Sequence, residues 1–506
     1  MLDRLRRDRD ERRRRIALQV MRRREQLLRP GYKVWGYKND LAKGFLVTCA
    51  PTTLGPERWV AETLGSWHIR RDPVLEHAAA RSASAAVLVL GHAFDEGGAG
   101  TRHRVAERLL RAADAPGGEA AQTAALDEAV TWLSGRYVVL VARGDRLDAW
   151  GDPLATRSLF WHRGEHGVAL ASHSALLAEL AGGLGSSRLR WVLDHPDYRS
   201  PAGRWLPGLI TPYDGVGQIY ANQRLTVEGG SVTGERFFPA ADRVELTAEE
   251  AGERFVDDLR RQIRSWIDVS PVTVLALTAG RDSRAILEAG LPDLQAADAL
   301  TMTYHPFHVA RKSTYYDMLT AGRISAAAGL PHLGIDVAPM KPSSEMARLY
   351  LATFPAWQRY ANLANALYLH SPAKASTIFG VGGAIITGMW RDTSDRHLRP
   401  ELLAAKYTDS AFRGDPQLHE ELARWMDHTR FSVDRLRGYD FYDLYHWEHR
   451  MTKWGGAGYA EYDLATTPAP VLSSRRLLVA ALSLPKPQRE SAEVYRFAAG
   501  LADADA

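Results

Sequence analysis

The chain has 506 residues, of which 45% are hydrophobic and 25% are charged, and its formal net charge is +4. This length allows two or three domains with substantial cores. A single cysteine excludes a disulfide framework, and the longest apolar run, near Ala85 to Leu90, is too short to span a bilayer.

Residues 1–30 hold twelve arginines and five acidic residues, so the positive charge is local. Ile16, Val20, Leu27 and the arginines between them suit a helix that ends at Pro30. The segment is either a solvated, partly disordered arm or a dock for an acidic peptide or protein partner. Nucleic acid is the least favoured partner, because no RNA-binding signature accompanies the arginines. The segment lacks the apolar core of a secretory signal, so the sequence predicts a soluble cytoplasmic protein with no membrane partner.

Residues 31–240 are expected to form a sandwich domain of short antiparallel strands. Alternating apolar residues, separated by Gly, Asp and Pro turns, run from Leu133 to Leu140, from Leu147 to Leu154 and from Leu170 to His173. The small, polar stretch Pro116 to Ala125 is expected to be a flexible loop within this domain.

Cys49 follows Phe45-Leu46-Val47-Thr48 and precedes Ala50. Because its neighbours are mostly apolar, the pattern predicts a buried thiol that serves as a small hydrophobic side chain.

A second domain, residues 241–506, begins with Thr247-Ala248-Glu249-Glu250, a capping box that starts a helix. The apolar run Val272 to Leu277 then breaks into Thr278-Ala279-Gly280-Arg281-Asp282-Ser283 and continues as a helix. A strand, a small-residue turn and a helix N-terminus make an anion site in this order, because the first helical N–H groups face the turn. The hydroxyl groups of Thr278 and Ser283 add donors, and Asp282 is a candidate Mg²⁺ ligand.

Leu300 to Tyr304 and His332 to Val337 are expected strands on either side of a helix from Lys312 to Gly329. This β-α-β-α-β alternation predicts a parallel sheet whose ligand lies at the carboxyl ends of its strands. The predicted fold class is therefore α/β and α+β in two domains, an antiparallel sandwich with helices followed by a doubly wound parallel sheet.

The turn matches neither the Walker loop nor the dinucleotide fingerprint. Its sequence T-A-G-R-D-S resembles the S-G-G-x-D-S pyrophosphate loop of ATP pyrophosphatases, the superfamily of asparagine synthetases, β-lactam synthetases and lasso-peptide cyclases. The family's acidic residue and helix are matched by Asp317 and the residues after it, and Ile378 to Gly383 resembles its second glycine-rich loop. The resemblance implies Mg²⁺ on Asp282 and ATP bound by Thr278, Ala279, Gly280, Arg281, Asp282, Ser283, Gly382 and Gly383.

The strands of residues 31–240 independently resemble the glutaminase-like (Ntn-type) domain that precedes the synthetase domain in this superfamily. The nucleophile of that domain is a processed N-terminal cysteine, whereas this chain starts Met1-Leu2 and its only cysteine is Cys49. Glutamine hydrolysis is therefore not expected. The amine must come from elsewhere, as it does in β-lactam synthetases and lasso-peptide cyclases.

Three positions depart from the family pattern. Ala279 replaces a loop glycine, Ala384 stands where relatives carry acidic residues, and Glu493, with Arg496 after it, stands at the place of a lysine. The charge reversal at Glu493 removes a cation suited to stabilising the oxyanion. The candidate catalytic cations in its place are Lys486, Lys453 and Arg450, which are otherwise surface or interdomain charges.

Residues 441–456 also resemble a synthetase segment of natural-product relatives. His446 and His449 flank Glu448, but H-E-x-x-H is absent and no third ligand stands at a suitable spacing, so zinc is not favoured. The aromatic residues are predicted to be core more than a substrate platform, and they are Tyr442, Tyr445, Trp447 and Trp454.

The resemblance implies an ATP-dependent, glutamine-independent ligase that adenylates a carboxylate and joins it to an amine in natural-product biosynthesis. A cyclase is preferred, because the substrate then supplies the amine. One alternative is an adenylating ligase with a separate amine donor. The other is a degenerate homologue that binds nucleotide or a partner without turnover, which Ala279, Ala384 and Glu493 favour.

Overall fold

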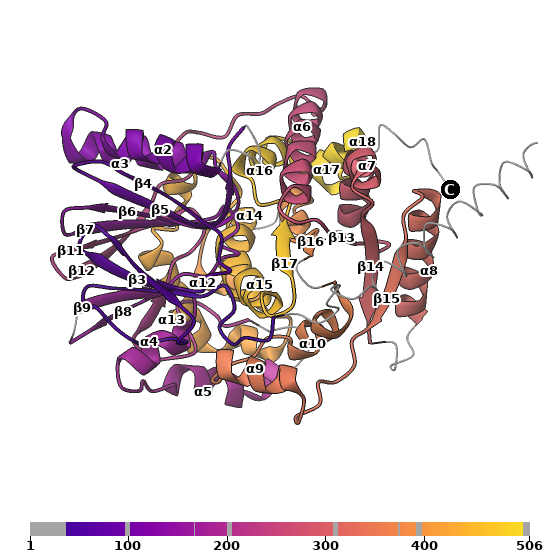
Figure 1. Cartoon of the computed structure of the whole chain (residues 1–506). Coiled ribbons are helices and arrows are strands. Elements are labelled where there is room, and N and C mark those ends of the chain that lie inside the picture. Colours follow the sequence, from indigo (N-terminus) through magenta and orange to yellow (C-terminus); the bar gives the residue numbers. More distant parts are fainter. Residues whose placement is uncertain are drawn as a thin grey trace, which may run out of the picture.

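The computed structural model describes residues 37–96, 102–165, 167–199, 205–306, 312–372, 375–390 and 397–498. The arm expected at residues 1–30 lies outside the described residues, so its role stays a prediction. Within the described ranges, no helix is long and apolar enough to cross a membrane. Figure 1 shows antiparallel sheets on the left and a parallel sheet with its helices on the right. The chain is a mixed α/β protein, as the sequence predicts.

Two six-stranded antiparallel sheets form the sandwich. The first contains β1 (Phe45–Thr48), β2 (Val60–Leu64), β3 (Trp67–Arg71), β8 (Phe160–Gly164), β9 (Gly167–Ala171) and β10 (Val216–Gln218). The second contains β4 (His77–Arg81), β5 (Ala86–Phe94), β6 (Ser134–Arg143), β7 (Arg146–Gly151), β11 (Gln223–Glu228) and β12 (Ser231–Arg236). Their strand orders are β10-β8-β9-β1-β3-β2 and β12-β11-β7-β6-β5-β4.

Alternation along each strand places one apolar set between the sheets and one set under helices. On β6, Val138 and Leu140 belong to the core between the sheets, while Val139 and Val141 pack under α2 (Arg102–Ala113) and α3 (Gly118–Thr131). On the other sheet, Leu46 packs with residues of α4 (Ser174–Leu180). The sandwich therefore has four layers, with helices outside two sheets.

The flexible loop predicted at Pro116 to Ala125 is wrong, because α3 covers most of this stretch. Most of this stretch is helical, and Thr123, Leu126 and Val130 bury one face of the helix. Its alanines have the highest helix propensity of any residue. The Pro-Gly-Gly turn signal marks only the approach to the helix.

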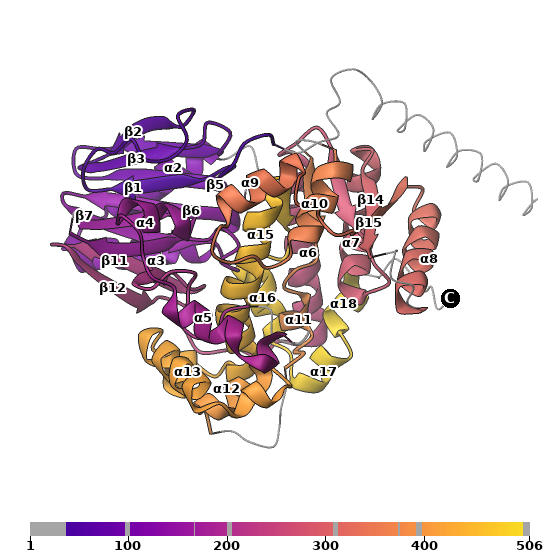
Figure 2. The same cartoon turned by 90° about the horizontal axis from the view of Figure 1, so that it is seen from below.

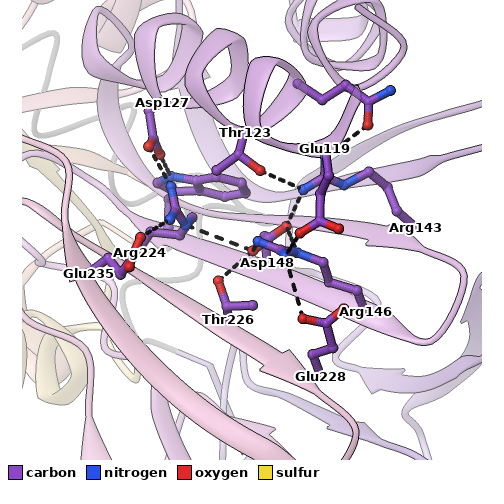
Figure 3. A network of polar contacts seen from close by, with 12 residues as sticks. Glu119, Thr123, Asp127, Arg143, Arg146, Asp148, Arg224, Thr226, Glu228 and Glu235 are labelled. Carbon is purple, nitrogen blue, oxygen red and sulfur yellow. Dashed lines mark hydrogen bonds and ion pairs between the residues drawn. The ribbon is translucent and has the colours of Figure 1, made fainter. Parts of the chain in front are cut away.

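A polar network fastens α3 to the sheet beneath it (Figure 3). Asp148 on β7 has no exposed surface and accepts hydrogen bonds from Arg143 (2.6 Å) and Arg146 (2.9 Å), while Arg224 on β11 pairs with Asp127 of α3. Burial alone would raise the pKa of Asp148, but the hydrogen bonds, that from Arg146 foremost, lower it below its ordinary value.

Cys49 is exposed, which corrects the expected buried thiol. Strand β1 ends at Thr48, so Cys49 lies in the bend beyond it, and its Sγ contacts the carbonyl oxygen of Val168 at 3.2 Å. The apolar residues before Cys49 are buried because they belong to β1. Cys49 lies beyond the end of this strand, so the sandwich does not cover it.

The C-terminal half contains a five-stranded parallel sheet of order β15-β14-β13-β16-β17. The strands are β13 (Thr273–Ala276), β14 (Leu300–His305), β15 (His332–Asp336), β16 (Ser376–Phe379) and β17 (Thr467–Pro470). The expected strands at 272–277, 300–304 and 332–337 and the helix between the last two are confirmed, with α8 at Lys312–Ala327.

Helices cover both faces of this sheet, and Figure 2 shows α9, α10 and α15 between the sandwich and the parallel strands. The other α-helices before η5 are α5 (Ser187–Asp194), α6 (Ala248–Ile267), α7 (Arg281–Ala296), α9 (Glu345–Thr353), α10 (Ala361–His370), α11 (Gly383–Ile386), α12 (Pro400–Tyr407), α13 (Pro416–His428) and α14 (Phe441–Tyr445). After them come the π-helix η5 (His446–Gly455), α15 (Gly456–Tyr462), α16 (Arg475–Leu482), α17 (Lys486–Glu490) and α18 (Glu493–Ala498). The capping box predicted at Thr247 and Glu250 is present at the start of α6.

Buried ion pairs join the two halves. Arg136 on β6 donates two hydrogen bonds of 2.7 Å to the carboxylate of Asp463, which follows α15, and Lys43 Nζ lies 3.4 Å from the same group. Burial would raise the pKa of Asp463, but the charges of Arg136 and Lys43 lower it to about 2. Arg236 and Glu448 form a second buried pair across the same junction.

Candidate functional site

The order of the parallel strands creates a topological switch point beside β13. The chain first adds β14 and β15 on one side of β13 and later adds β16 and β17 on the other. In open α/β sheets, ligands bind outside the carboxyl ends of the strands at such a point. The turn at residues 278–283 and the glycine-rich loop at residues 380–383 follow β13 and β16, so both lie at this edge.

The first turn of α7 has free donors. Gly280 is its N-cap, with φ −68° and ψ 153°, and no side chain caps the helix. Within the described residues, the backbone N–H groups of Arg281, Asp282 and Ser283 have no acceptor. Unpaired N–H groups and the positive end of a 16-residue helix favour an anion at this position.

The N–H groups of the turn itself are already paired. Thr278 N–H donates to Ser283 Oγ at 3.0 Å, and Gly280 N–H donates to Thr278 Oγ1 at 3.0 Å. Ala279 N–H donates to the carboxylate of Asp317 on α8. The chain therefore supplies its own anion to one backbone donor of the turn.

Asp317 is held by a second contact from the adjacent strand. His305 Nε2, at the end of β14, lies 2.5 Å from Asp317 Oδ2, and the Asp317 side chain is 17% exposed. The resemblance predicts Asp317 as the family's acidic residue, but it does not indicate this contact with His305. Ala279 replaces the family's glycine without backbone strain, because its φ is not positive.

The two predicted loops meet at Asp282. A Cβ added to Gly383 would lie 2.1 Å from Asp282 Cγ, so only glycine allows this approach. Gly382, with φ +109°, turns the chain into α11. The structure thus brings together Asp282 and Gly383, which the sequence places far apart.

Asp282 also has a partner that sequence reasoning missed. Tyr495 Oη donates to Asp282 Oδ1 at 2.9 Å, and burial raises the pKa of Asp282 above its ordinary value. Tyr495 lies on α18, two residues after Glu493, which pairs with Arg496 at 3.3 Å. Helix α18, which carries Glu493 at the place of the family's lysine, therefore contacts the turn through the Tyr495 hydroxyl group.

Two of the candidate cations, Arg450 and Lys453, lie on η5, and Lys486 begins α17. Lys453 Nζ donates to the carbonyl oxygen of Ile210 at 2.8 Å and is buried. Lys486 lines a groove beside Asp440 and Arg489.

Arg450 packs among three indole rings. Its guanidinium carbon lies 5.1 Å from the ring centroid of Trp205, 5.3 Å from that of Trp390 and 5.2 Å from that of Trp454. Within the described ranges, neither Arg450 nor Lys453 has a hydrogen bond or ion pair with residues 278–283. The cation of the site stays a prediction.

The segment from residue 441 to residue 456 is mostly interior. Glu448 pairs with Arg236 at 2.6 Å, and His446 and His449 are buried among aromatic rings. Tyr442, Tyr445 and Trp447 are buried as predicted, whereas Trp454 is half-buried. Within the part of the chain that the structure describes, no three His, Cys, Asp or Glu side chains are placed to hold a metal ion. Mg²⁺ at Asp282 would therefore need ligands from phosphate and water.

Comparison with known proteins gives no family assignment: no family model and no curated protein matches the chain. Among solved structures, the chain is similar to one titled the allosteric regulatory enzyme of purine biosynthesis, with 10% identity and a TM-score of 0.24. That match covers 55% of this chain and 66% of the other, just under two thirds of its length. It is also similar to glutamine phosphoribosylpyrophosphate amidotransferase from B. subtilis complexed with ADP and GMP. In that case the identity is 9%, the TM-score 0.23, and the coverage 70% and 76%.

Proposed function

We propose that the chain is an ATP-dependent ligase that activates a carboxylate as its adenylate and converts it to an amide. In this proposal, residues 31–240 form a glutaminase-like (Ntn-type) domain without its nucleophile, and residues 241–506 form a domain of the ATP-pyrophosphatase type. The observation that carries the proposal is the first turn of α7 at the switch point, with unpaired N–H groups next to Asp282 and Gly383.

The reaction has two steps. A substrate carboxylate oxygen attacks the α-phosphorus of ATP, the bond to the β-phosphate breaks, and pyrophosphate leaves. An amine nitrogen then attacks the acyl carbon, loses a proton, and displaces AMP. The N–H groups of residues 281–283 would hold phosphate oxygens, and Mg²⁺ on Asp282 would supply charge neutralisation.

The amine is proposed to belong to the substrate, so that the product is cyclic. The support is the lack of a nucleophilic cysteine for glutamine hydrolysis, because the single cysteine, Cys49, lies beyond the end of β1. A separate amine donor gives the same AMP and pyrophosphate but a product of larger mass. Mass spectrometry of the product separates these two versions.

The test is formation of AMP and pyrophosphate from ATP and Mg²⁺ across a panel of carboxylates and amino-acid or peptide substrates. The wild type should form both products, and Asp282→Ala should form neither. Asp293→Asn is the matched control, because Asp293 lies near the other end of α7 in an exposed pair with Arg264. Equal turnover by the wild type and Asp282→Ala would place the chemistry elsewhere.

A second candidate is a homologue that binds nucleotide or a partner without turnover. Two contacts favour it: the Asp317 carboxylate on Ala279 N–H, and the Tyr495 hydroxyl on Asp282. Both use groups that an ATP phosphate or Mg²⁺ would otherwise contact. ATP binding without AMP formation, on any substrate of the panel, is the result that selects this candidate.

A further inference from the structure

A cleft lies where the sandwich meets the C-terminal half. Its volume is about 640 Å³, including open solvent at its mouth, and both halves line it. The loop after α9 and the helices η5 and α15 form one side, and β8, α4 and the loop at residues 206–213 form the other. No lining residue belongs to residues 278–283 or 380–383, so this is a separate site from the proposed ATP site.

The walls are largely apolar. They include Leu206, Ile210, Phe354 and Trp357. A concave, mostly apolar surface with a few polar groups at the junction of two units is the usual form of a small-molecule site. The polar groups therefore decide which ligand fits.

Lys453 lines this wall, and its amine is buried with one hydrogen-bond acceptor. Its Nζ donates to one carbonyl oxygen, that of Ile210 at 2.8 Å, and lies 5.2 Å from the ring centroid of Tyr220. Within the described residues, Lys453 forms no ion pair, and the carboxylate of Glu421, whose charge acts on Lys453, pairs instead with Arg188. An ammonium group has three donors, so two remain after the bond to Ile210. Burial, and after it the charge of Arg188, lower the pKa of Lys453 to about 7, while the charge of Glu421 opposes this shift.

Glu461, the acidic residue that lines the cleft, does not pair with the Lys453 amine. Glu461 accepts hydrogen bonds from the backbone N–H groups of Arg359 (2.7 Å) and Tyr360 (3.0 Å). His173 uses Nδ1 for Ser172 Oγ at 2.8 Å, and burial lowers its pKa to about 4, so its ring is neutral. Its Nε2 has no partner within the described ranges and remains for a ligand.

We propose that this cleft binds a small, largely apolar monocarboxylate, with its carboxylate at Lys453 and its apolar body against Leu206, Phe354 and Trp357. A carboxylate supplies the charge that the ammonium lacks, and the apolar walls exclude strongly hydrated anions. Lys453, a candidate for the cation of the ligase reaction, is thereby assigned to a different site. This inference does not depend on ATP binding.

The test compares benzoate, its neutral analogue benzyl alcohol, and inorganic phosphate by isothermal titration calorimetry on the full chain. Benzoate should bind the wild type saturably, and benzyl alcohol and phosphate at least tenfold more weakly. Lys453→Met should bind benzoate about 10- to 100-fold more weakly, the range expected for one lost hydrogen bond to a charged group. Lys341→Met is the control, because Lys341 is exposed and outside the cleft, and it should bind within twofold of the wild type.

The comparison of benzoate with benzyl alcohol uses only the wild type, so it stands even if Lys453→Met does not fold. Benzyl alcohol binding as tightly as benzoate overturns the proposal. So does phosphate binding as tightly as benzoate, undiminished benzoate binding by a folded Lys453→Met, or no saturable binding of benzoate by the wild type.

Discussion

Replacing Asp463 by Asn should loosen the junction between the two halves of the chain. The substitution removes the negative charge that faces Arg136 and Lys43, which are both buried. The pKa of Asp463 falls from 3.8 to about 2 on folding. At about 1.36 kcal/mol per pKa unit, this difference corresponds to roughly 2 kcal/mol. Two cations left without a partner raise the expected loss to about 3–5 kcal/mol.

The sign of the pH dependence follows from the lowered pKa. Because folding depresses the pKa of Asp463, its contribution is present above the unfolded pKa near 4 and is lost as pH falls toward 2. The free-energy gap between the wild type and Asp463→Asn should therefore be largest at neutral pH and shrink between pH 4 and 2.

Urea unfolding, followed by tryptophan fluorescence and far-UV circular dichroism, measures this gap at each pH. Asp293→Asn is the control, because it breaks an exposed pair with Arg264 and should change the free energy of unfolding by less than about 1 kcal/mol. A loss below about 0.5 kcal/mol for Asp463→Asn at pH 7, or a gap that does not vary with pH, would refute the reasoning.

Three further predictions concern single residues. Cys49 should react with a thiol reagent such as Ellman's reagent in the native protein, and reaction only after denaturation would contradict its exposure. Gly383→Ala should lower the free energy of unfolding by about 1–3 kcal/mol, because its Cβ would overlap Asp282, and an unchanged urea midpoint would contradict this contact. Asp317→Asn should bind pyrophosphate roughly tenfold more tightly by calorimetry, because it removes one charge, worth about 1.4 kcal/mol, beside Ala279 N–H. Unchanged or weaker binding would show that Asp317 does not compete with an anion.

Local patterns predicted the elements around the candidate site well. The β-branched run before Thr278 and the helical residues after Asp282 gave the strand, turn and helix in their observed order. Alternation with the two following strands gave the parallel sheet. These features depend on residues that are neighbours in sequence, so the periodicity of apolar residues predicts them.

The contacts within the site join residues that are distant in sequence, and the periodicity of apolar residues does not predict such contacts. Tyr495 bonds Asp282 across 213 positions, and Lys453 bonds the carbonyl oxygen of Ile210 across 243. A lysine next to a tryptophan in a helix looks the same whether it lines an active site or an interdomain cleft. The predictions at α3 and Cys49 were wrong for a different reason. The turn signal at Pro116 to Gly118 was taken to cover residues that are helical, and the apolar run before Cys49 was taken to continue through it.

Equilibrium binding of ATP in the presence of Mg²⁺ tests the central claim most directly. Calorimetry on the wild type, Asp282→Ala and the control Asp293→Asn separates binding at the N-terminus of α7 from binding elsewhere. Saturable binding by the wild type and the control, at least tenfold weaker in Asp282→Ala, is the predicted result. No saturable binding by the wild type, or equal binding by all three proteins, would contradict a nucleotide site at this turn.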